Sequence, residues 1–389
     1  MQRSTQVLDH AVLELARRRG AVTRPELALD LGVTAATITN VVKRLLGDQL
    51  LVESGHLAST GGKPRSLLRL NPTSRYSLGV SFGPGRLIVA LTDFTGAAVG
   101  RAAFPMQAVG RAADLRRGLS DRLDDILKSF DVSHQSLAGI GVADPVGAGT
   151  PWLDGEDGAL SVSEPAIEQV RRDTGLPVVV GDEASCAALA ELWNGSPVEV
   201  GANFATLYMS TQITAGLVLN GRIHQVTPRG SLGHVSIDRN GAPCPCGARG
   251  CIDVLASPAA VVEHVLTNAP HARRLGLLGA PTTRAVDFAQ IGRAAVQGDK
   301  TCSAAIHDSA EALAVGVANL VVMLDVQRVF LAGPGFADAG SIYEQVINDG
   351  LARVHRTGTR PVRVTLSRLD LGSAAIGAAS LVLQSRALR

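Results

Sequence analysis

The sequence predicts an α/β protein in which a small N-terminal domain precedes a larger body made of two similar halves. Residues 1–72 place apolar side chains at helical spacing before two strand-like segments, whereas the chain from residue 76 onward alternates strands with helices. Only 3% of the residues are aromatic, but 42 are glycine. A core rich in Ala, Val, Leu and glycine suits close packing of helices on sheets.

Two observations bear on where the protein resides. No uninterrupted apolar stretch approaches the roughly 18 residues that a membrane span needs. The N-terminus, MQRSTQVLDH, lacks the apolar run of a signal peptide. The sequence therefore predicts a cytoplasmic protein with no membrane partner.

The head, defined as residues 1–72, carries the pattern of three short helices. Thr23 and Glu26 have the spacing of a capping box at the start of the second helix. Gly32 then supplies a sharp turn before Thr34, a good N-cap residue for the third helix. Two helices joined by such a turn are typical of a helix-turn-helix.

The third helix is expected to turn a polar face outward, because its apolar residues recur every three or four positions. Short side chains near its start allow the backbone to approach base edges. Asn40 is suited to an adenine, and Lys43 to a phosphate or a guanine. The residues of this region predicted to contact DNA are Thr34, Ala36, Thr37, Asn40 and Lys43.

Two strand-like segments, 50–53 and 66–70, flank a glycine-rich loop that carries Lys63 and Arg65. Strand, basic loop and strand are typical of a wing, so both residues are predicted to contact the DNA backbone or minor groove. The head holds ten Lys/Arg and six Asp/Glu, and the remainder holds 27 and 29. This balance favours a winged helix-turn-helix that binds double-stranded DNA. The alternative is a small helical bundle used for dimerisation.

Beyond a linker at Asn71–Ser74, the body is expected to form two lobes, residues 76–195 and 196–389. Each opens with paired strands and continues through helix and strand, which predicts a duplicated fold with a ligand cleft between the halves. The expected strands are 77–83, 86–93, 138–142, 178–180, 203–208, 216–221 and 328–332, and the expected helices are 115–130 and 304–323.

A cysteine cluster gives the most specific local signal in the chain. Cys244, Cys246 and Cys251 follow His234 by ten or more residues. Three thiolates and an imidazole close a tetrahedral zinc site, and because all four ligands come from the protein, the predicted zinc is structural. The alternative is three structural cysteines beside a chance histidine. Cys186 and Cys302 are interpreted as small buried hydrophobic residues.

Several motifs together resemble the ROK family, which groups sugar kinases with transcription regulators that carry an added winged head. The most specific are Gly233-His234 and the run Cys244-Pro-Cys-Gly-Ala-Arg-Gly-Cys251. Further matches are Gly139–Val142, Pro177–Val180 leading to Glu191, and the Ala/Gly-rich stretch that begins at Leu371. The resemblance covers nearly the whole chain. It implies an actin/hexokinase-like (ribonuclease H-like) pair of lobes with a sugar between them.

Three nucleotide-binding segments depart from the pattern of the family's kinases. Ser81–Gly85 replaces Asp-x-Gly-Gly-Thr, and Pro84 removes one N–H donor. Ser210–Gly216 replaces Gly-Thr-Gly-x-Gly-Gly, and Gly333-Pro334 replaces Gly-Gly. Because backbone N–H groups hold the ATP phosphates in such kinases, these changes predict that the protein is not an enzyme.

The resemblance places Glu183 where the kinases carry their aspartate base, so no catalytic residue is expected to function here. Asp182 replaces an amide expected to hold the sugar, Ser231 replaces a glutamate, and Asp253 replaces another. The candidate ligand-binding residues are Asp182, Glu183, Ser231, His234 and Asp253. Alternatively, these are ordinary surface or capping groups and the pocket is vestigial.

These observations predict a DNA-binding regulator of carbohydrate-related genes, and we expect it to repress transcription. Its body senses a sugar or sugar derivative, and a homodimer or homotetramer presents two heads to a double-stranded DNA operator. Two alternatives stay open: an active ROK sugar kinase with a regulatory head, and a ligand-independent DNA-binding protein whose body serves only assembly.

Overall fold

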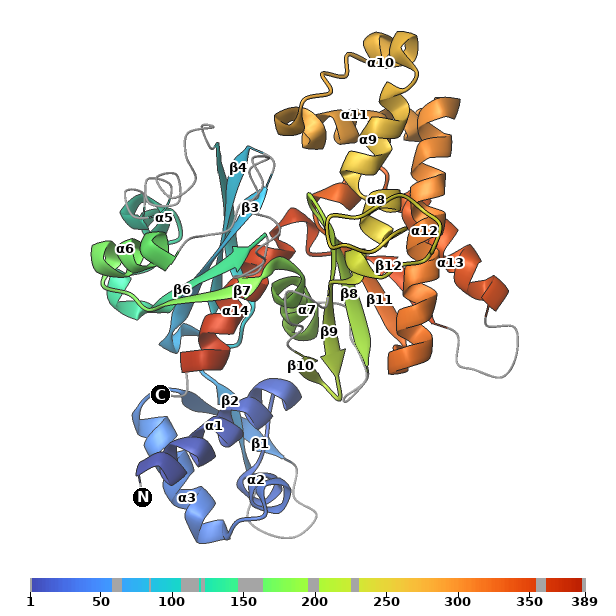
Figure 1. Cartoon of the computed structure of the whole chain (residues 1–389). Helices are drawn as coiled ribbons and strands as arrows, with labels where there is room; N and C mark the ends of the chain where they lie inside the picture. Colours follow the sequence, from blue (N-terminus) through green and yellow to red (C-terminus); the bar gives the residue numbers. More distant parts are fainter. Residues whose placement is uncertain are drawn as a thin grey trace.

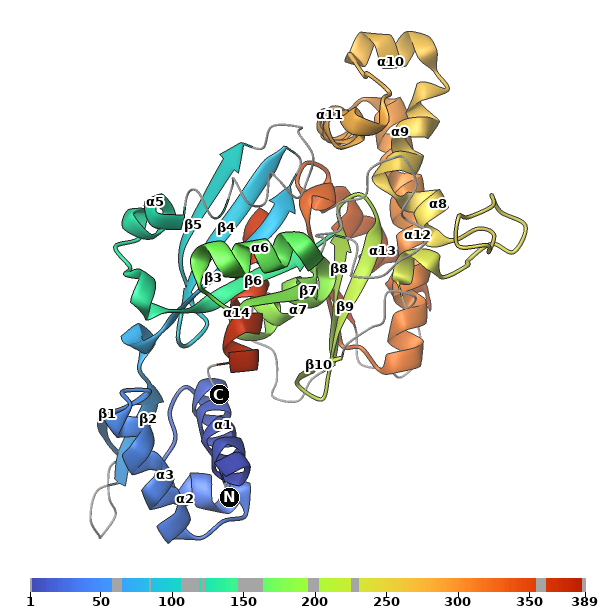
Figure 2. The ribbon, with the colours of Figure 1, turned by 60° about the vertical axis from the view of Figure 1, so that its left-hand side comes forward.

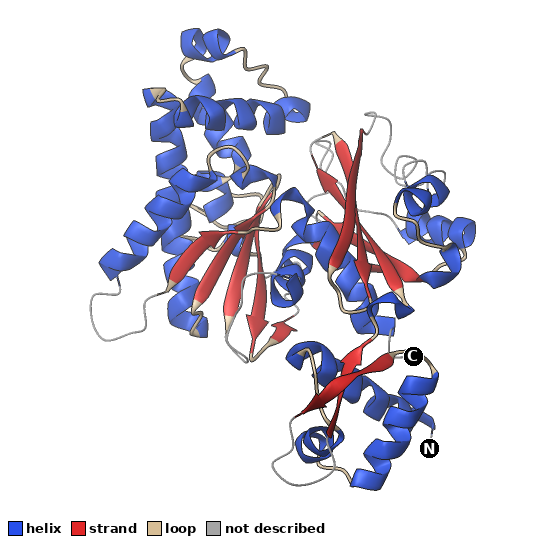
Figure 3. Cartoon of the chain, turned by 180° about the vertical axis from the view of Figure 1, so that it is seen from behind, coloured by secondary structure: helices blue, strands red, loops and turns tan. Residues whose placement is uncertain are grey.

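The computed structural model describes residues 2–57, 65–83, 85–105, 119, 123–145, 164–194, 203–224, 231–354 and 362–386. Figure 1 shows a head below a body that contains two sheets. Figure 3 shows helices packed around both sheets, which confirms the α/β class.

The head is formed by three helices and one antiparallel pair of strands. Its elements are α1 (Gln2–Arg19), α2 (Arg24–Leu31), α3 (Ala35–Gly47), β1 (Leu51–Leu57) and β2 (Arg65–Leu70). The expected capping box is confirmed, since Thr23 accepts from the backbone of Glu26 and the Glu26 side chain accepts from the backbone of Thr23. Gly32 ends α2 in the left-handed conformation with φ 62°.

The first lobe is built on a five-stranded sheet with the order β5-β4-β3-β6-β7. The first three strands are antiparallel and the last two join in parallel. The elements are β3 (Tyr76–Gly83), β4 (Arg86–Asp93), β5 (Ala98–Pro105), α5 (Leu123–Ser129), β6 (Leu137–Asp144), α6 (Glu164–Thr174), β7 (Val178–Asp182) and α7 (Glu183–Asn194).

The second lobe repeats this topology, with the strand order β10-β9-β8-β11-β12. The predicted duplication is thereby confirmed, because the third, second, first, fourth and fifth strands of each half occupy equivalent places. The elements are β8 (Phe204–Met209), β9 (Ile213–Leu219), β10 (Arg222–His224), α8 (Ile252–Ala256), α9 (Pro258–Leu266), α10 (Ala269–Leu275), α11 (Arg284–Val296), α12 (Lys300–Leu324), β11 (Arg328–Ala332), α13 (Gly340–Val354), β12 (Arg363–Leu366) and α14 (Ser373–Arg386).

Two helices, α7 and α14, connect the lobes. Each packs on the sheet of the lobe to which it does not belong in sequence. The C-terminal helix α14 covers the first-lobe strands β3, β4 and β6, whereas α7 lies against β8 and β9 of the second lobe. The two helices also pack on each other, as Figures 1 and 2 both show. The range 196–389 expected for the second lobe includes α14, but the buried face of this helix packs on the sheet of the first lobe.

Glycines permit this close packing. A Cβ at Gly141 would lie 1.9 Å from the carbonyl oxygen of Ala378, and one at Gly377 would lie 1.6 Å from that of Cys186. Real Cβ atoms do not approach backbone this closely, so the helices can touch the sheet and each other only where a side chain is absent.

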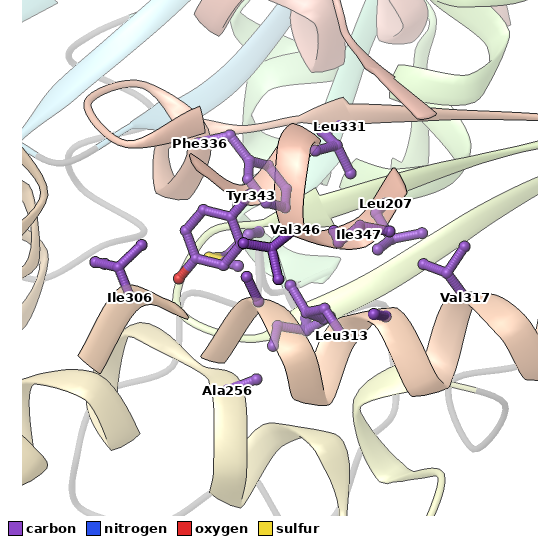
Figure 4. Packing of buried hydrophobic residues seen from close by; sticks show 14 of the residues in the cluster. Leu207, Ala256, Ile306, Leu313, Val317, Leu331, Phe336, Tyr343, Val346 and Ile347 are labelled. Atoms are coloured by element: carbon purple, nitrogen blue, oxygen red, sulfur yellow. The ribbon is translucent and has the colours of Figure 1, made fainter. Parts of the chain in front are cut away.

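The largest core lies in the second lobe, between the sheet and helices α12 and α13. Figure 4 shows Tyr343 pointing into this cluster. Its ring stacks edge-on against Phe336 at 5.2 Å, and its hydroxyl lies 2.8 Å from Ser309 Oγ. This satisfies the polar end of a fully buried aromatic residue.

Helix α12 is long and apolar enough, by length and composition, to cross a membrane. The helix is not an uninterrupted apolar stretch, because His307, Asp308 and Glu311 lie within it. In the structure, α12 contributes to the second-lobe core and packs on α11 and α13. That placement is the one found for core helices of globular folds.

Most expected elements are present, with small shifts at their ends. The strands expected at 77–83 and 86–93 pair antiparallel, and the helix expected at 304–323 extends to Lys300–Leu324. Of the helix expected at 115–130, the structure describes Leu123–Ser129, and part of the rest lies outside the described residues. The linker forms a short 3-10 turn, Pro72–Ser74.

Candidate functional sites

Helix α3 belongs to the head, which lies below the body in Figures 1 and 2, and it has one buried side and one exposed side. Ile38, Val41, Val42 and Leu45 are buried, as their spacing predicts. Ala36, Asn40 and Lys43 are exposed. The helix therefore presents a short side chain, an amide and a cation on one accessible side.

Thr34 and Thr37 also serve the start of α3. The Thr34 side chain accepts from the Thr37 backbone N–H at 3.2 Å, and the two hydroxyls lie 2.8 Å apart. Thr34 is exposed, but Thr37 is half-buried. Their hydroxyls thus cap the helix, which leaves Asn40 and Lys43 as the polar groups free to face a partner.

Ion pairs fix the orientation of α3 and the hairpin within the head. The Arg44 guanidinium binds both carboxylate oxygens of Asp9 on α1, and Arg24 at the start of α2 pairs with Glu53 of β1 at 3.0 Å. Arg65 opens β2 and is exposed, whereas Lys63 lies outside the described residues.

The predicted metal ligands converge in the second lobe. His234, Cys244, Cys246 and Cys251 place their donor atoms within 4.8 Å of one another. Cys244 Sγ lies 3.6 Å from His234 Nδ1, and Cys246 Sγ lies 3.6 Å from Cys251 Sγ. Ligands at the corners of a tetrahedron around zinc stand about 3.5–3.8 Å apart, given the usual Zn–N and Zn–S lengths. The cluster therefore fits a metal ion.

The loop around these cysteines is shaped by glycine and backbone hydrogen bonds. Gly247 and Gly250 have φ values of 93° and 56°. A Cβ at Gly250 would lie 1.9 Å from the carbonyl oxygen of Asp238, so only glycine fits there. Burial lowers the pKa of His234, which favours the neutral imidazole that a metal requires.

A second group of metal-type donors, His271, Asp299 and Cys302, has a different explanation. The guanidinium of Arg274 lies 2.5 Å from His271 Nδ1. Because arginine can only donate, Nδ1 must accept, and the proton sits on Nε2, which lies 3.1 Å from Asp299 Oδ1. That Nε2 then has no lone pair for a metal. Asp299 also caps α12.

Two of the predicted ligand-binding residues lie at the junction of β7 and α7. Asp182 Oδ1 accepts from the Ser185 backbone N–H at 2.8 Å and so caps α7. Glu183 is buried, and its Oε2 accepts from Ser210 Oγ at 2.9 Å. Burial, with smaller contributions from Asp144 and Asp182, raises the pKa of Glu183 to about 8.

Ser231 and Asp253 lie on the other side of the turn between β8 and β9. Ser231 Oγ donates to the carbonyl of Ile213 at 3.1 Å, and Asp253 Oδ1 accepts from the Ile213 N–H at 2.9 Å. Burial raises the pKa of Asp253 to about 6. The turn Ser210–Ile213 is thus held by Glu183 at one end and by Ser231 and Asp253 at the other.

Two residues beside Glu183 were not among the predicted site residues. Ser210 donates to its carboxylate, and Asp144 is fully buried at the adjacent end of β6. The signal for Asp144 was its place just after the strand expected at 138–142. Ser210 begins the segment Ser210–Gly216 that departs from the kinase pattern, but no local pattern links it to Glu183, 27 residues away.

Comparison with known proteins agrees with this architecture. The model of the ROK family matches residues 78–385. The xylose repressor of Caldicellulosiruptor bescii is 24% identical over 321 residues, which cover 80% of this chain and 78% of that protein.

Two solved structures share the fold. One is a ROK family transcriptional regulator described as a homologue of the Escherichia coli MLC protein, with a TM-score of 0.72 and 21% identity, covering 99% of this chain and 98% of the other. The other is a ROK family glucokinase from Streptomyces griseus in complex with glucose and AMPPNP, with a TM-score of 0.59 and 21% identity, covering 79% and 98%. With its body matched almost end to end by the family model, this chain belongs to the ROK family.

Proposed function

We propose that this protein is a sugar-responsive transcriptional repressor whose head is a winged helix-turn-helix that binds double-stranded DNA. The observation that carries the proposal is the exposed face of α3, with Ala36, Asn40 and Lys43 on one side and the β1–β2 hairpin beside it. The structure of the ROK family transcriptional regulator aligns with 99% of this chain, head included, whereas that of the glucokinase aligns with 79%.

The DNA contacts divide into two kinds. Asn40 reads an adenine edge, because its amide has a donor and an acceptor at the right spacing, and Lys43 contacts a phosphate or a guanine. Lys63 and Arg65 contact the DNA backbone or the minor groove. Two heads in a homodimer or homotetramer would bind a two-fold operator.

The test begins with selection of binding sites from random double-stranded DNA by the full-length protein. Binding of the selected site is then compared for Asn40→Ala and Lys43→Ala by fluorescence anisotropy across salt concentrations. Asn40→Ala should cost about 1–3 kcal/mol and relax preference at one base pair, while Lys43→Ala should reduce the salt slope by about one. Selection that enriches no sequence would contradict the proposal.

The body is proposed to sense a sugar without phosphorylating it. The ligand is held at the ends of β6 and β7 and around the β8–β9 turn by Asp182, Glu183, Ser231, His234 and Asp253. A ligand of this kind alters DNA affinity only if it binds one arrangement of the lobes better than another. Zinc at His234, Cys244, Cys246 and Cys251 has a structural role and stabilises the loop beside this region.

An active sugar kinase is the second candidate. Glu183, at the position of the base, favours it, because its pKa of about 8 lies near the operating pH, where a base works best. Against it stand the altered phosphate segments at Ser81–Gly85 and Ser210–Gly216. A coupled assay with ATP and a panel of hexoses separates the two. Turnover that is lost in Glu183→Gln would favour the kinase.

A body that serves only assembly is the third candidate. Thermal melting of the zinc-loaded protein with candidate sugars distinguishes it, since any ligand that binds the folded state raises the midpoint by mass action. A protein that binds its operator but shows no shift with any sugar would favour this candidate.

A further inference from the structure

A cavity of about 250 Å³ lies between α8, α9 and α12 of the second lobe, three helices that pack together in Figure 1. Five of its lining residues are apolar: Val254 and Leu255 from α8, Ala260 and Val261 from α9, and Ala305 from α12. Val261 and Ala305 are buried. The residues proposed to hold a sugar are not among those that line it. The cavity therefore offers an apolar surface outside the proposed sugar site.

The size of the cavity limits what it can hold. An apolar cavity of about 150 Å³ is large enough for a benzene ring. The cavity beside α8, at about 250 Å³, has room for such a ring and a short chain. A sugar would place several hydroxyl groups against the apolar lining, where each hydroxyl without a partner is costly. The lining thus favours a ligand with an apolar ring.

The polar lining of the cavity is acidic. It consists of Glu263, His264 and Asp308, which are all exposed, and it includes no Lys or Arg. The Glu263 carboxylate is paired with Arg284 at 3.1 Å. Asp308, by contrast, forms no ion pair or side-chain hydrogen bond with any described residue. Its carboxylate is free to accept hydrogen bonds from a cation in the cavity.

A second carboxylate strengthens this preference for a cation. Glu311, on the next turn of α12, places an oxygen within 4.8 Å of an oxygen of Asp308. The guanidinium of Arg353 lies farther from Asp308's helix face and reaches Glu311 only at 3.9 Å. Like charges on neighbouring turns of a helix repel each other. A cation bound at Asp308 would reduce this repulsion.

Helix α8 connects the cavity to the zinc loop, defined as residues 235–250 between the proposed ligands His234 and Cys251. Cys251 is the N-cap residue of α8. The next residue but one, Asp253, accepts from the backbone N–H of Ile213 at 2.9 Å. Because Val254 and Leu255 of the same short helix line the cavity, a ligand packed against them would hold α8, and with it the end of the zinc loop, in place.

We propose that this cavity binds a small organic cation, a protonated amine carried on an aromatic or alicyclic ring, and that the bound cation stabilises the zinc loop through α8. The ring displaces water from the apolar lining. The ammonium group donates to the carboxylate of Asp308, a charge-assisted hydrogen bond. The site does not depend on the sugar sensing proposed for the body.

The experiment uses isothermal titration calorimetry on the zinc-loaded full-length protein. The probes are phenethylamine, phenethyl alcohol and phenylacetate, which share a ring and differ in charge at neutral pH. Phenethylamine should bind at least about threefold more tightly than the alcohol, as an exposed ion pair allows, and phenylacetate should bind most weakly. At saturating phenethylamine, zinc should be released more slowly to a chelating dye, because the ligand favours the closed loop.

Two pairs of variants locate the binding. Ala260→Leu fills the cavity and should abolish binding of phenethylamine, whereas Ala259→Leu, on the same helix but outside the lining, should leave it unchanged. Ala260→Val repeats the test if the leucine variant does not fold. Asp308→Asn should remove the preference for the amine over the alcohol, and Glu311→Gln should reduce it less.

Three results would overturn the proposal. The first is that no probe binds at millimolar concentration. The second is that phenethylamine binds no more tightly than the alcohol, and the third is that it binds Ala260→Leu as well as the wild type. A rate of zinc release that stays the same at saturating amine would contradict the stabilisation of the zinc loop through α8.

Discussion

The guanidinium carbon of Arg17 lies 3.8 Å from the centroid of the Trp193 ring. Arg17 belongs to α1 of the head, and Trp193 lies near the end of α7 in the body. The same helix begins with Glu183, which contacts the second lobe through Ser210. One helix of 12 residues therefore contacts the candidate ligand site at its start and the head at its end.

Loss of this contact should loosen the head from the body. A cation–π pair contributes about 0.5–2 kcal/mol, so Arg17→Ala should separate the melting of the head from that of the body, while Arg17→Lys should have a smaller effect. Calorimetry measures the two transitions. The chain has two tryptophans, so emission from Trp193 alone, in a Trp152→Phe background, reports the contact directly. Unchanged emission and a single transition in Arg17→Ala would count against this role.

The stability of the protein should fall as pH rises past neutrality because of Glu183. Its pKa is raised from 4.5 to about 8 by burial, so the protonated form stabilises the fold below pH 4.5 and this contribution is lost as pH rises through 8. Between pH 7 and 9 the loss is on the order of 1 kcal/mol. Asp253, with a pKa raised to about 6, has the same sign but titrates mostly below this window.

Glu183→Gln removes the titration and retains a hydrogen-bonding side chain, so its melting temperature should rise relative to that of the wild type by about 1–2 °C between pH 7 and 9. Thermal melts at several pH values measure the difference. A constant gap across this window would show that Glu183 does not titrate there.

Gly141→Ala should destabilise the protein strongly, because the added methyl would lie 1.9 Å from the carbonyl oxygen of Ala378 on α14. We expect a loss of about 3 kcal/mol or more, measured by urea unfolding. Gly47→Ala is the matched control, since a Cβ there meets nothing within 4 Å and alanine favours the helix by about 0.5–1 kcal/mol. Equal effects of the two substitutions would contradict the packing described for α14.

The metal site should hold one zinc ion per chain. Cys246→Ser should lose the ion and lower the melting temperature, because a structural zinc stabilises the loop that it closes. Cys302→Ala is the control. Cys302 also lies in the second lobe, but it belongs to the group with His271 and Asp299, in which Arg274 contacts His271. Zinc is counted by emission spectroscopy after gel filtration. Zinc retained by Cys246→Ser, or lost by Cys302→Ala, would place the metal elsewhere.

Local signals made much of the fold predictable. The capping box of Thr23 and Glu26 and the burial of Ile38 depend on residues within a few positions of each other, and both are as expected. The convergence of the cysteines was foreseen for the same reason, since Cys244 and Cys251 share one short loop. The repeated order of strands followed from the similar sequence of elements in each half.

The contacts that could not be predicted are those between residues far apart in the sequence. Nothing near Arg17 indicates that its partner is Trp193, and the packing of α14 on the first sheet depends on glycines in two different segments. Ser231 and Asp253 were expected to face a ligand, yet their described hydrogen bonds support the backbone of Ile213. Pairing of polar groups across a turn depends on tertiary structure, which local patterns do not determine.

The most direct test of the central claim is the affinity of the full-length protein for its selected DNA site, measured with and without a sugar that binds the body. We expect the sugar to weaken DNA binding at least fivefold, as a coupling of about 1 kcal/mol or more requires, and ATP to be neither consumed nor needed. An affinity that stays the same at saturating sugar, or a sugar that is phosphorylated in the same mixture, would contradict the account.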